Sequence, residues 1–247
     1  YLLGNIKDNF EEIDFKKVDL NELPELEQFM LHKLYSLDVN FKKYFKNYDF
    51  HNLYKELLNF CTVDLSAFYF DIRKDSLYCD SIDSKKRKST ILLLNIILNS
   101  LLKWFAPILS FTTEEIYRLL FKDSKSVHLE KFLNFPNNFE NKKLYQKWLE
   151  LIKIRNICNI SIEEKRANKE IGSSLEADLN IHLDKKLEEI TKNIDFSELC
   201  ITSKAEISFK ENSETSAQTT KANGTKCTLC WKISENACYR SHCPKKT

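Results

Sequence analysis

The stretch "DSKKRKSTILLLNIILNSLLKWFAP", residues 83–107, decides the fold class. After a basic first turn it is apolar on most faces, which is typical of a helix buried inside a helical domain. Asn95, Asn99 and Lys103 interrupt the apolar run. A bilayer needs about 20 mostly apolar residues in succession, so this segment does not suit a membrane. Because Pro107 ends or kinks the helix, we expect one central helix of a mainly α-helical protein.

Segments on both sides of this helix carry apolar residues at helical spacing, and the chain holds only three glycines in 247 residues. Few glycines favour helices over sheets with tight turns. Short joints between such helices predict an antiparallel helix bundle over residues 21–170. The flanking helices are expected within residues 19–50, 49–75, 110–121 and 141–170.

The pattern changes at "IGSSLEADLNIHLD", residues 171–184. Gly172 is expected to stop the preceding helix. Apolar and polar residues then alternate, which predicts a strand. A short helix and a second strand would complete a small α/β unit over residues 171–209. Residues 210–226 are polar without periodicity and are interpreted as a flexible linker.

The chain ends in a cysteine-rich tail, "CTLCWKISENACYRSHC", residues 227–243. Cys227 and Cys230 are separated by two residues, so one tight turn can direct both sulfurs at one ion. Structural zinc sites have four ligands, and Cys238 and Cys243 are the natural second pair. His242 is the alternative fourth ligand. We expect one structural Zn²⁺ with every position filled, and therefore no zinc catalysis.

The other cysteines are scattered through the chain as Cys61, Cys79, Cys158 and Cys200. They suit buried free thiols in a reducing compartment. A disulfide-linked or unstructured tail is the alternative to zinc, but the chain lacks secretory features. We expect a cytoplasmic monomer that does not associate with membranes.

The formal net charge is only +2, so any surface that binds nucleic acid must be local. In the tail, Trp231, Lys232 and Arg240 suit a phosphate-rich partner, because lysine and arginine neutralise phosphates and an indole can stack on an unpaired base. A solvated tail in which Trp231 covers the zinc ion is the alternative.

Two further basic groups lie at helix ends. Lys85, Lys86 and Arg87 start the helix of residues 83–107, where positive charges oppose the helix dipole. This group is either an RNA contact or a solvated helix start. Arg73 lies near the end of the preceding helix, where a cation is favoured in any case, and it is a further candidate RNA contact.

Several segments together resemble one family. "CTLCW" after a polar linker resembles the C-terminal zinc module of bacterial isoleucyl-tRNA synthetases, which are class I enzymes. "YLLGNI", within residues 1–20, resembles the junction that leaves their catalytic core. Three further segments resemble other parts of this family. "YDFHNLYKELLNFCTVDLSAFYFDIRKDSLYCD" resembles its anticodon-binding helices, and "LLKWFAPILSFTTEEIY" resembles the next helical hairpin of class I synthetases for isoleucine, valine, leucine and methionine. "EEKRANKEIGSSLEADL" resembles the segment that joins the bundle to the tail.

This resemblance implies binding of isoleucine tRNA through the anticodon stem and loop. It places Lys165, Arg166 and Lys169 close to where the family binds RNA. The HIGH-type and KMSKS-type motifs that hold ATP are absent from these residues. We therefore expect the catalytic and editing domains, and ATP, to belong to a missing part of the enzyme, and we expect no catalytic residue here.

The chain departs from the family in two ways, the missing ATP-binding motifs and the second cysteine pair, and three other interpretations remain. The second cysteine pair has four intervening residues rather than the usual two. A freestanding RNA-binding zinc protein would lack any catalytic domain. A fragment of a valyl or leucyl synthetase would share the helical part. A DNA-repair glycosylase would share the zinc module, but the linker and helix bundle argue against it.

Overall fold

The computed structural model describes residues 1–6, 10, 13–121, 126–236 and 238. The chain divides into two compact units. Unit 1 comprises residues 1–68 and 82–142, and unit 2 comprises residues 69–81 and 143–247. The protein is mainly helical, with a small sheet and a cysteine cluster near the C-terminus. This confirms the predicted fold class at that level.

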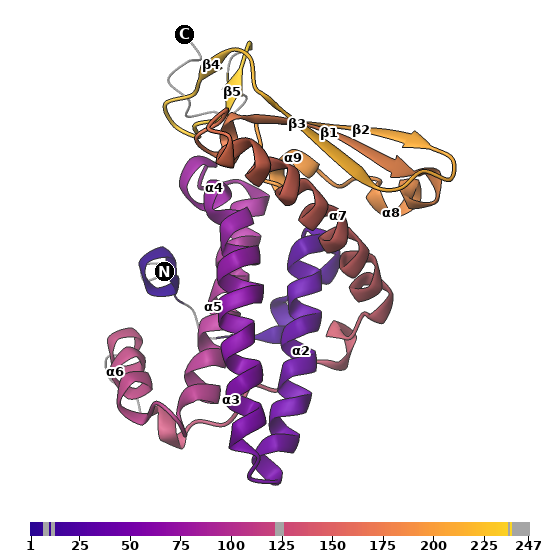
Figure 1. The fold of residues 1–247 in the computed structure, drawn as a ribbon. Helices are drawn as coiled ribbons and strands as arrows, with labels where there is room; N and C mark the ends of the chain where they lie inside the picture. Colours follow the sequence, from indigo (N-terminus) through magenta and orange to yellow (C-terminus); the bar gives the residue numbers. More distant parts are fainter. Residues whose placement is uncertain (7–9, 11–12, 122–125, 237, 239–247) are drawn as a thin grey trace. The chain divides into compact units, whose positions relative to one another are not determined.

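The described part of unit 1 is built from helices (Figure 1). Their bounds are α1 Leu2–Ile6, α2 Glu25–Lys46, α3 Phe50–Asn59, α5 Lys85–Phe105 and α6 Ser110–Leu120. Helix α2 packs against α3 and α5, and α5 also packs against α1 and α6. Since α5 contacts so many partners, it is the central helix that its sequence predicts.

The core of unit 1 follows the apolar pattern of α5. Ile96 and Ile97 are fully buried, and Trp104 stands edge-on to the Phe41 ring of α2 with the ring centres 4.9 Å apart. Asn95 and Asn99 are also buried, and each side-chain amide donates to the backbone carbonyl four residues earlier in the same helix. Such bonds lower the cost of burying an amide.

A π-helical segment, Phe60–Phe70 (η4), lies between α3 and α4 Asp71–Cys79. The sequence predicts one continuous amphipathic helix over this region. The wider turn of a π-helix rotates the positions that follow it relative to regular α spacing. Apolar periodicity therefore predicts the helix but not this change of turn.

Unit 2 combines helix α7 Lys142–Ala167 with a three-stranded sheet of order β2-β1-β3. The strands are β1 Ala177–Asp184, β2 Lys204–Lys210 and β3 Ser216–Lys221. β2 runs parallel to β1, and β3 runs antiparallel to it. The connection from β1 to β2 contains the short helices α8 Glu188–Thr191 and α9 Phe196–Leu199. Ser161 of α7 and Thr219 of β3 are hydrogen-bonded through their hydroxyl groups (2.8 Å).

A second, two-stranded sheet pairs β4 Thr225–Lys226 with β5 Ile233–Ser234. Gly224 precedes β4 with a φ of 120°, and a Cβ at this position would lie 2.3 Å from the carbonyl carbon of Ser234. Only glycine fits so close an approach at that backbone angle. This glycine lets the two strands meet.

Two sequence predictions for this unit are wrong. Residues 210–226 are not simply a linker, because residues 216–221 form β3 and pair with the central strand. Gly172 does not end helix α7, which stops at Ala167. Instead Lys169 adopts a φ of 59°, and the Glu170 N–H donates to the Lys165 carbonyl (3.0 Å). This is a left-handed helix ending of the kind that glycine usually supplies.

Within the described residues, no helix combines the length and the apolar character that a membrane crossing requires.

Candidate metal centre and RNA-contact residues

The β4–β5 hairpin shapes the first cysteine pair. The Cys227 N–H donates to the Lys232 carbonyl (2.9 Å), and the Trp231 N–H donates to the Cys227 carbonyl (3.0 Å). Trp231 has a φ of 62°, which reverses the chain. The Leu229 N–H points at the Cys227 sulfur at 3.4 Å. This turn brings the sulfurs of Cys227 and Cys230 to one side, as the two-residue spacing predicts.

Three of the predicted ligands gather at this turn. The sulfur atoms of Cys227, Cys230 and Cys238 all lie within 4.8 Å of one another, and those of Cys230 and Cys238 are 3.9 Å apart. Sulfurs in a tetrahedral zinc site, each about 2.3 Å from the ion, lie about 3.8 Å apart. The soft thiol donors and their spacing therefore fit Zn²⁺. Cys243, His242 and Arg240 lie outside the described residues.

Polar contacts attach this hairpin to the rest of unit 2. The Lys226 ammonium pairs with Glu176 (3.2 Å), and the Ile233 N–H donates to the Ser203 hydroxyl (2.6 Å). Lys232 is half-buried, and its ammonium donates to the Ser197 hydroxyl (3.3 Å). By contrast, the side chain of Trp231 is 61% exposed. Of the two predicted RNA contacts in the tail that the structure describes, Trp231 is therefore the more accessible, and Lys232 is already hydrogen-bonded within unit 2.

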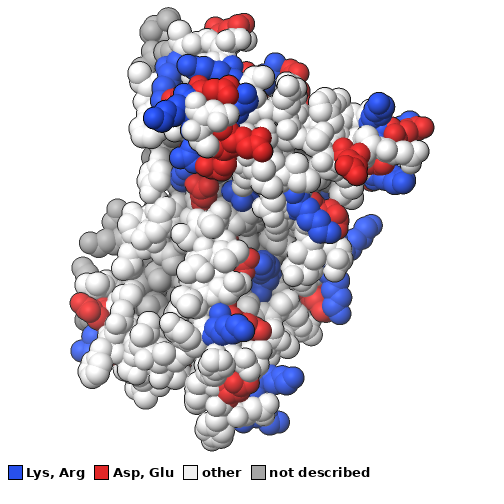
Figure 2. Space-filling model, viewed as in Figure 1, with Lys and Arg blue, Asp and Glu red and all other residues white. Residues whose placement is uncertain are grey.

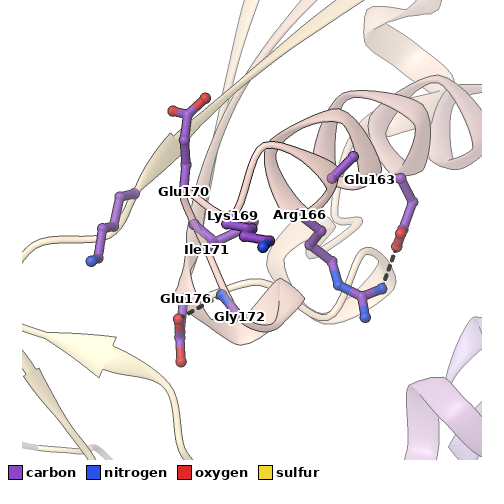
Figure 3. Close-up of a pocket in the computed structure, with 9 residues that line it drawn as sticks. Glu163, Arg166, Lys169, Glu170, Ile171, Gly172 and Glu176 are labelled. Atoms are coloured by element: carbon purple, nitrogen blue, oxygen red, sulfur yellow. Dashed lines mark hydrogen bonds and ion pairs between the residues drawn. The ribbon is translucent and has the colours of Figure 1, made fainter.

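A second candidate region is a cleft of about 650 Å³ where α7 ends (Figure 3). It is lined by both signs of charge, including Arg166, Lys169, Glu170 and Lys221. Two of the predicted RNA contacts are ion-paired here: Arg166 with Glu163 (2.6 Å) and Lys165 with Glu170 (2.8 Å). Hydrogen bonding from Lys165 lowers the pKa of Glu170, which therefore remains a carboxylate at neutral pH.

Lys169 differs from its neighbours in the cleft. It is exposed, and within the described residues its ammonium has no hydrogen-bond or ion-pair partner. Lys221 of β3, on the cleft lining, likewise has no ion-pair partner there. The third carboxylate of the lining, Glu176, has a lowered pKa because it accepts from the Gly172 N–H and from Lys226. Lys169 and Lys221 are thus the cations of this cleft most available to an anion.

The basic start of α5 is the third candidate region. The Ser84 hydroxyl accepts from the Arg87 N–H (3.4 Å) and caps the helix. Lys85 is exposed, whereas Lys86 and Arg87 are half-buried. This cap explains how the helix begins despite its basic first turn. It is compatible both with an RNA contact and with a solvated helix start.

Arg73 is a correction to the sequence analysis. Its side chain is only 4% exposed, and the guanidinium pairs with Glu198 at 2.8 Å. A buried cation needs such a partner, because desolvation would otherwise destabilise it. Arg73 is therefore a structural residue and not an accessible RNA contact.

Cys79 is a buried free thiol, as its sequence context predicts, but its position near the metal centre was not predicted. It is the last residue of α4, is 7% exposed, and packs in one buried cluster with Cys227 and Cys230. No spacing rule connects residues so far apart in the chain. Its proximity becomes visible only in three dimensions.

Charge on the surface is mixed. On the face shown in Figure 2, lysine and arginine side chains are interspersed with aspartate and glutamate, without an extended single-sign patch. This agrees with the net charge of +2. Any RNA contact on this face would rest on individual side chains.

Comparison with known proteins identifies the class of this chain. Residues 27–181 match the family described as the anticodon-binding domain of tRNA ligase. This match covers more than half of the chain, so the protein belongs to that family.

Individual relatives extend the match to nearly the whole chain. Isoleucine–tRNA ligase of Pelagibacter ubique (strain HTCC1062) is 63% identical over 240 residues, which is 97% of this chain and 26% of that protein. The isoleucine–tRNA ligase of Agrobacterium fabrum is 37% identical over 245 residues, covering 94% of this chain and 25% of that protein. The isoleucine–tRNA ligase of Zymomonas mobilis is 37% identical over 236 residues, covering 94% and 24% respectively. The chain thus spans about a quarter of the length of these curated relatives.

Proposed function

We propose that this chain is the tRNA-anticodon-binding and zinc-binding C-terminal portion of an isoleucine–tRNA ligase, which attaches isoleucine to its tRNA with the use of ATP. The observation that carries the proposal is the 63% identity over 97% of the chain to a protein of that name. Because the chain spans about a quarter of such relatives, isoleucine activation and ATP binding belong outside it. The chain alone would act as a cytoplasmic monomer without catalysis.

The helices over residues 21–170 would form the antiparallel bundle of the class I anticodon-binding type. Residues 171–209, together with β3, would form the connecting α/β unit, and residues 227–243 the zinc module. The matched range of residues 27–181 supports the first assignment. The pairing of β1 with both β2 and β3 supports the second.

Zinc in this module would be structural. Cys227, Cys230 and Cys238 would hold the ion, with Cys243 as the fourth ligand and His242 as its alternative. Such an ion supplies folding energy, because the ligands cannot gather in the unfolded chain without it. The separation of 3.9 Å between the Cys230 and Cys238 sulfurs supports binding of such an ion.

RNA recognition would combine an exposed aromatic with accessible cations. Trp231 can stack on an unpaired base, while Arg240 and Lys232 approach phosphates. Lys165, Arg166 and Lys169 would contact the backbone at the cleft, with Lys169 contributing most since its ammonium is unpaired there. Lys85, Lys86 and Arg87 would add a third phosphate contact. Correct anticodon contacts would then favour productive placement of the distant acceptor end.

A binding titration tests this function. The zinc-loaded chain is titrated with an isoleucine tRNA transcript, and with the same transcript carrying a changed anticodon, at several fixed salt concentrations. We expect tighter binding of the native anticodon. Equal, salt-sensitive binding of both transcripts would indicate a general RNA-binding module instead.

Two lysine variants, one at the cleft and one on α7 away from it, test whether RNA contacts the cleft. Lys169→Ala should weaken binding a few-fold and lower the salt slope by about one, as expected for one lost phosphate contact. Lys153→Ala is the control, since Lys153 is exposed on α7 and paired with Glu150 (2.7 Å). Equal effects of the two substitutions would exclude a specific role for the cleft.

A further inference from the structure

The thiol of Cys79 reaches the turn that carries two of the metal ligands. Its sulfur lies 3.6 Å from the Leu229 carbonyl oxygen, and the thiol donates to that oxygen. Cys79 ends helix α4, 150 residues before Leu229 in the chain. Both belong to unit 2, and α4 lies beside the β4–β5 hairpin in Figure 1. This contact therefore joins a helix to the metal centre.

Leu229 is held from both sides. Its N–H points at the Cys227 sulfur at 3.4 Å, while its carbonyl accepts from Cys79. That carbonyl belongs to the peptide group that joins Leu229 to Cys230. Because a peptide group is planar, fixing the direction of its carbonyl also fixes the direction in which Cys230 leaves the turn. The hydrogen bond from Cys79 thus helps to orient Cys230, one of the metal ligands.

Cys79 itself stands outside the group of ligands. The sulfurs within 4.8 Å of one another, among the described residues, are those of Cys227, Cys230 and Cys238. Cys79 is buried in one cluster with Cys227 and Cys230, and its thiol donates to the Leu229 carbonyl. That hydrogen bond needs an S–H group, which a metal-bound thiolate lacks.

We propose that Cys79 is a positioning residue of the metal centre, whose S–H group holds the Cys227–Cys230 turn in its ligand geometry. The proposal rests on zinc binding as proposed above and adds a residue outside the tail. Groups that orient metal ligands typically change metal affinity about 10- to 100-fold when removed. A thiol is a weak donor, so we expect the lower end of that range.

The test uses the purified full chain with Cys79→Ala and Cys79→Ser, and with Cys61→Ala as control. Cys61 is a partly buried thiol of unit 1, far from the tail in sequence, and burial raises its pKa to about 11. The zinc dissociation constant is measured by competition with a chromophoric chelator. Cobalt(II) substitution reports the number of bound thiolates through the sulfur-to-cobalt absorption band. Denaturation of the metal-free chain reports stability separately.

We expect Cys79→Ala to raise the zinc dissociation constant about tenfold, with an unchanged cobalt–thiolate band. Cys79→Ser should restore most of the affinity, because a hydroxyl donates to the same carbonyl. Cys61→Ala should leave the constant unchanged. Stability of the metal-free chain should not account for the difference between the alanine and serine variants.

Several results would overturn the inference. A cobalt–thiolate band weakened in Cys79→Ala would make Cys79 a ligand rather than a positioning residue. An unchanged dissociation constant in Cys79→Ala, or an equal rise in both variants, would remove its role as a hydrogen-bond donor. Failure of the unmodified chain to bind zinc would instead refute the metal centre itself.

Discussion

Helix α5 and the cysteine hairpin are held in different ways. In α5, residues such as Leu94, Ile96 and Ile97 are fully buried among several helices, so many interchangeable apolar contacts fix it. In the hairpin, residues 225–236, the buried side chains include little more than Cys227 and Cys230. Its position depends on a few specific hydrogen bonds, one ion pair and the proposed metal. We therefore expect loss of one contact to disorder the whole hairpin. Loss of one apolar contact in α5 should only lower the stability of that helix.

Loss of a metal ligand should give the largest effect. Cys230→Ala removes a thiolate from the cluster, and the hairpin should lose its ordered structure because metal binding supplies about 10 kcal/mol or more in small zinc modules. Zinc content by mass spectrometry should fall, and amide exchange should rise over residues 225–236. Amides of α5 should stay protected. If the amides of the hairpin stay protected from exchange in a variant that holds no zinc, then the hairpin does not depend on the metal as proposed.

A core truncation in α5 should rank second. Leu94→Ala creates a cavity at a fully buried position, and should lower the free energy of unfolding by about 3 kcal/mol. Denaturant unfolding measures the loss. Zinc content should be unchanged, since the cavity leaves the cysteine turn intact. A zinc content that falls in parallel would show that the two regions are not independent.

Removing the ion pair between Arg73 and Glu198 tests a single specific contact in unit 2. Glu198→Ala would leave the guanidinium buried without this carboxylate. We expect a loss of about 2 kcal/mol, because a buried charged donor would lose this charged partner. Denaturant unfolding of Glu198→Ala beside Glu189→Ala, a nearby substitution on α8, isolates the effect. Equal stability of the two variants would show that the Arg73–Glu198 ion pair does not stabilise unit 2.

The smallest effect concerns the pH response of unit 1. His32 is 5% exposed, and its Nδ1 accepts from the Asn141 N–H (2.9 Å). Burial lowers the pKa of His32 below its ordinary 6.5, with the Glu140 charge partly opposing. The unfolded chain therefore binds the proton more readily, and stability present above pH 6.5 is lost as the pH falls through the folded pKa.

This response is measured against His32→Asn, whose amide oxygen accepts from the same N–H but does not titrate. The unfolding free energy of the unmodified chain, relative to that of His32→Asn, should decrease as the pH is lowered from about 7.5 to about 5.5. The unmodified chain should be the one that loses stability. If the difference in unfolding free energy does not change with pH, then the pKa of His32 is not lowered by folding.

The helices and the first strand could be predicted because their side chains repeat with the period of the structure. The apolar run of α5 and the alternation of β1 both have this property. Strand β3 could not be predicted, because it is mostly polar and pairs with β1 through backbone hydrogen bonds. Backbone pairing leaves little trace in the identity of residues such as Ser216 and Gln218.

For the candidate site, the sequence predicted the ligands that lie close together in the chain. The spacing of Cys227 and Cys230 is sufficient to predict a shared ion, and Cys238 joins them in space. The burial of Arg73 and the place of Cys79 beside the cysteine turn were not predicted, because their partners, Glu198 and Leu229, lie more than a hundred residues away. Such pairings follow from the tertiary fold, which local patterns do not encode.

The discontinuity of unit 2 sets an order of events during synthesis. Residues 69–81 leave the ribosome before the remainder of their unit, which begins only at Lys143. At roughly 10 residues per second, this segment waits several seconds for α7 and longer for the cysteine hairpin. During that time Arg73 and Cys79 have neither of the partners described above. A nascent chain stalled before residue 143 should therefore expose α4 to protease and to thiol-reactive probes, whereas the released chain should protect it.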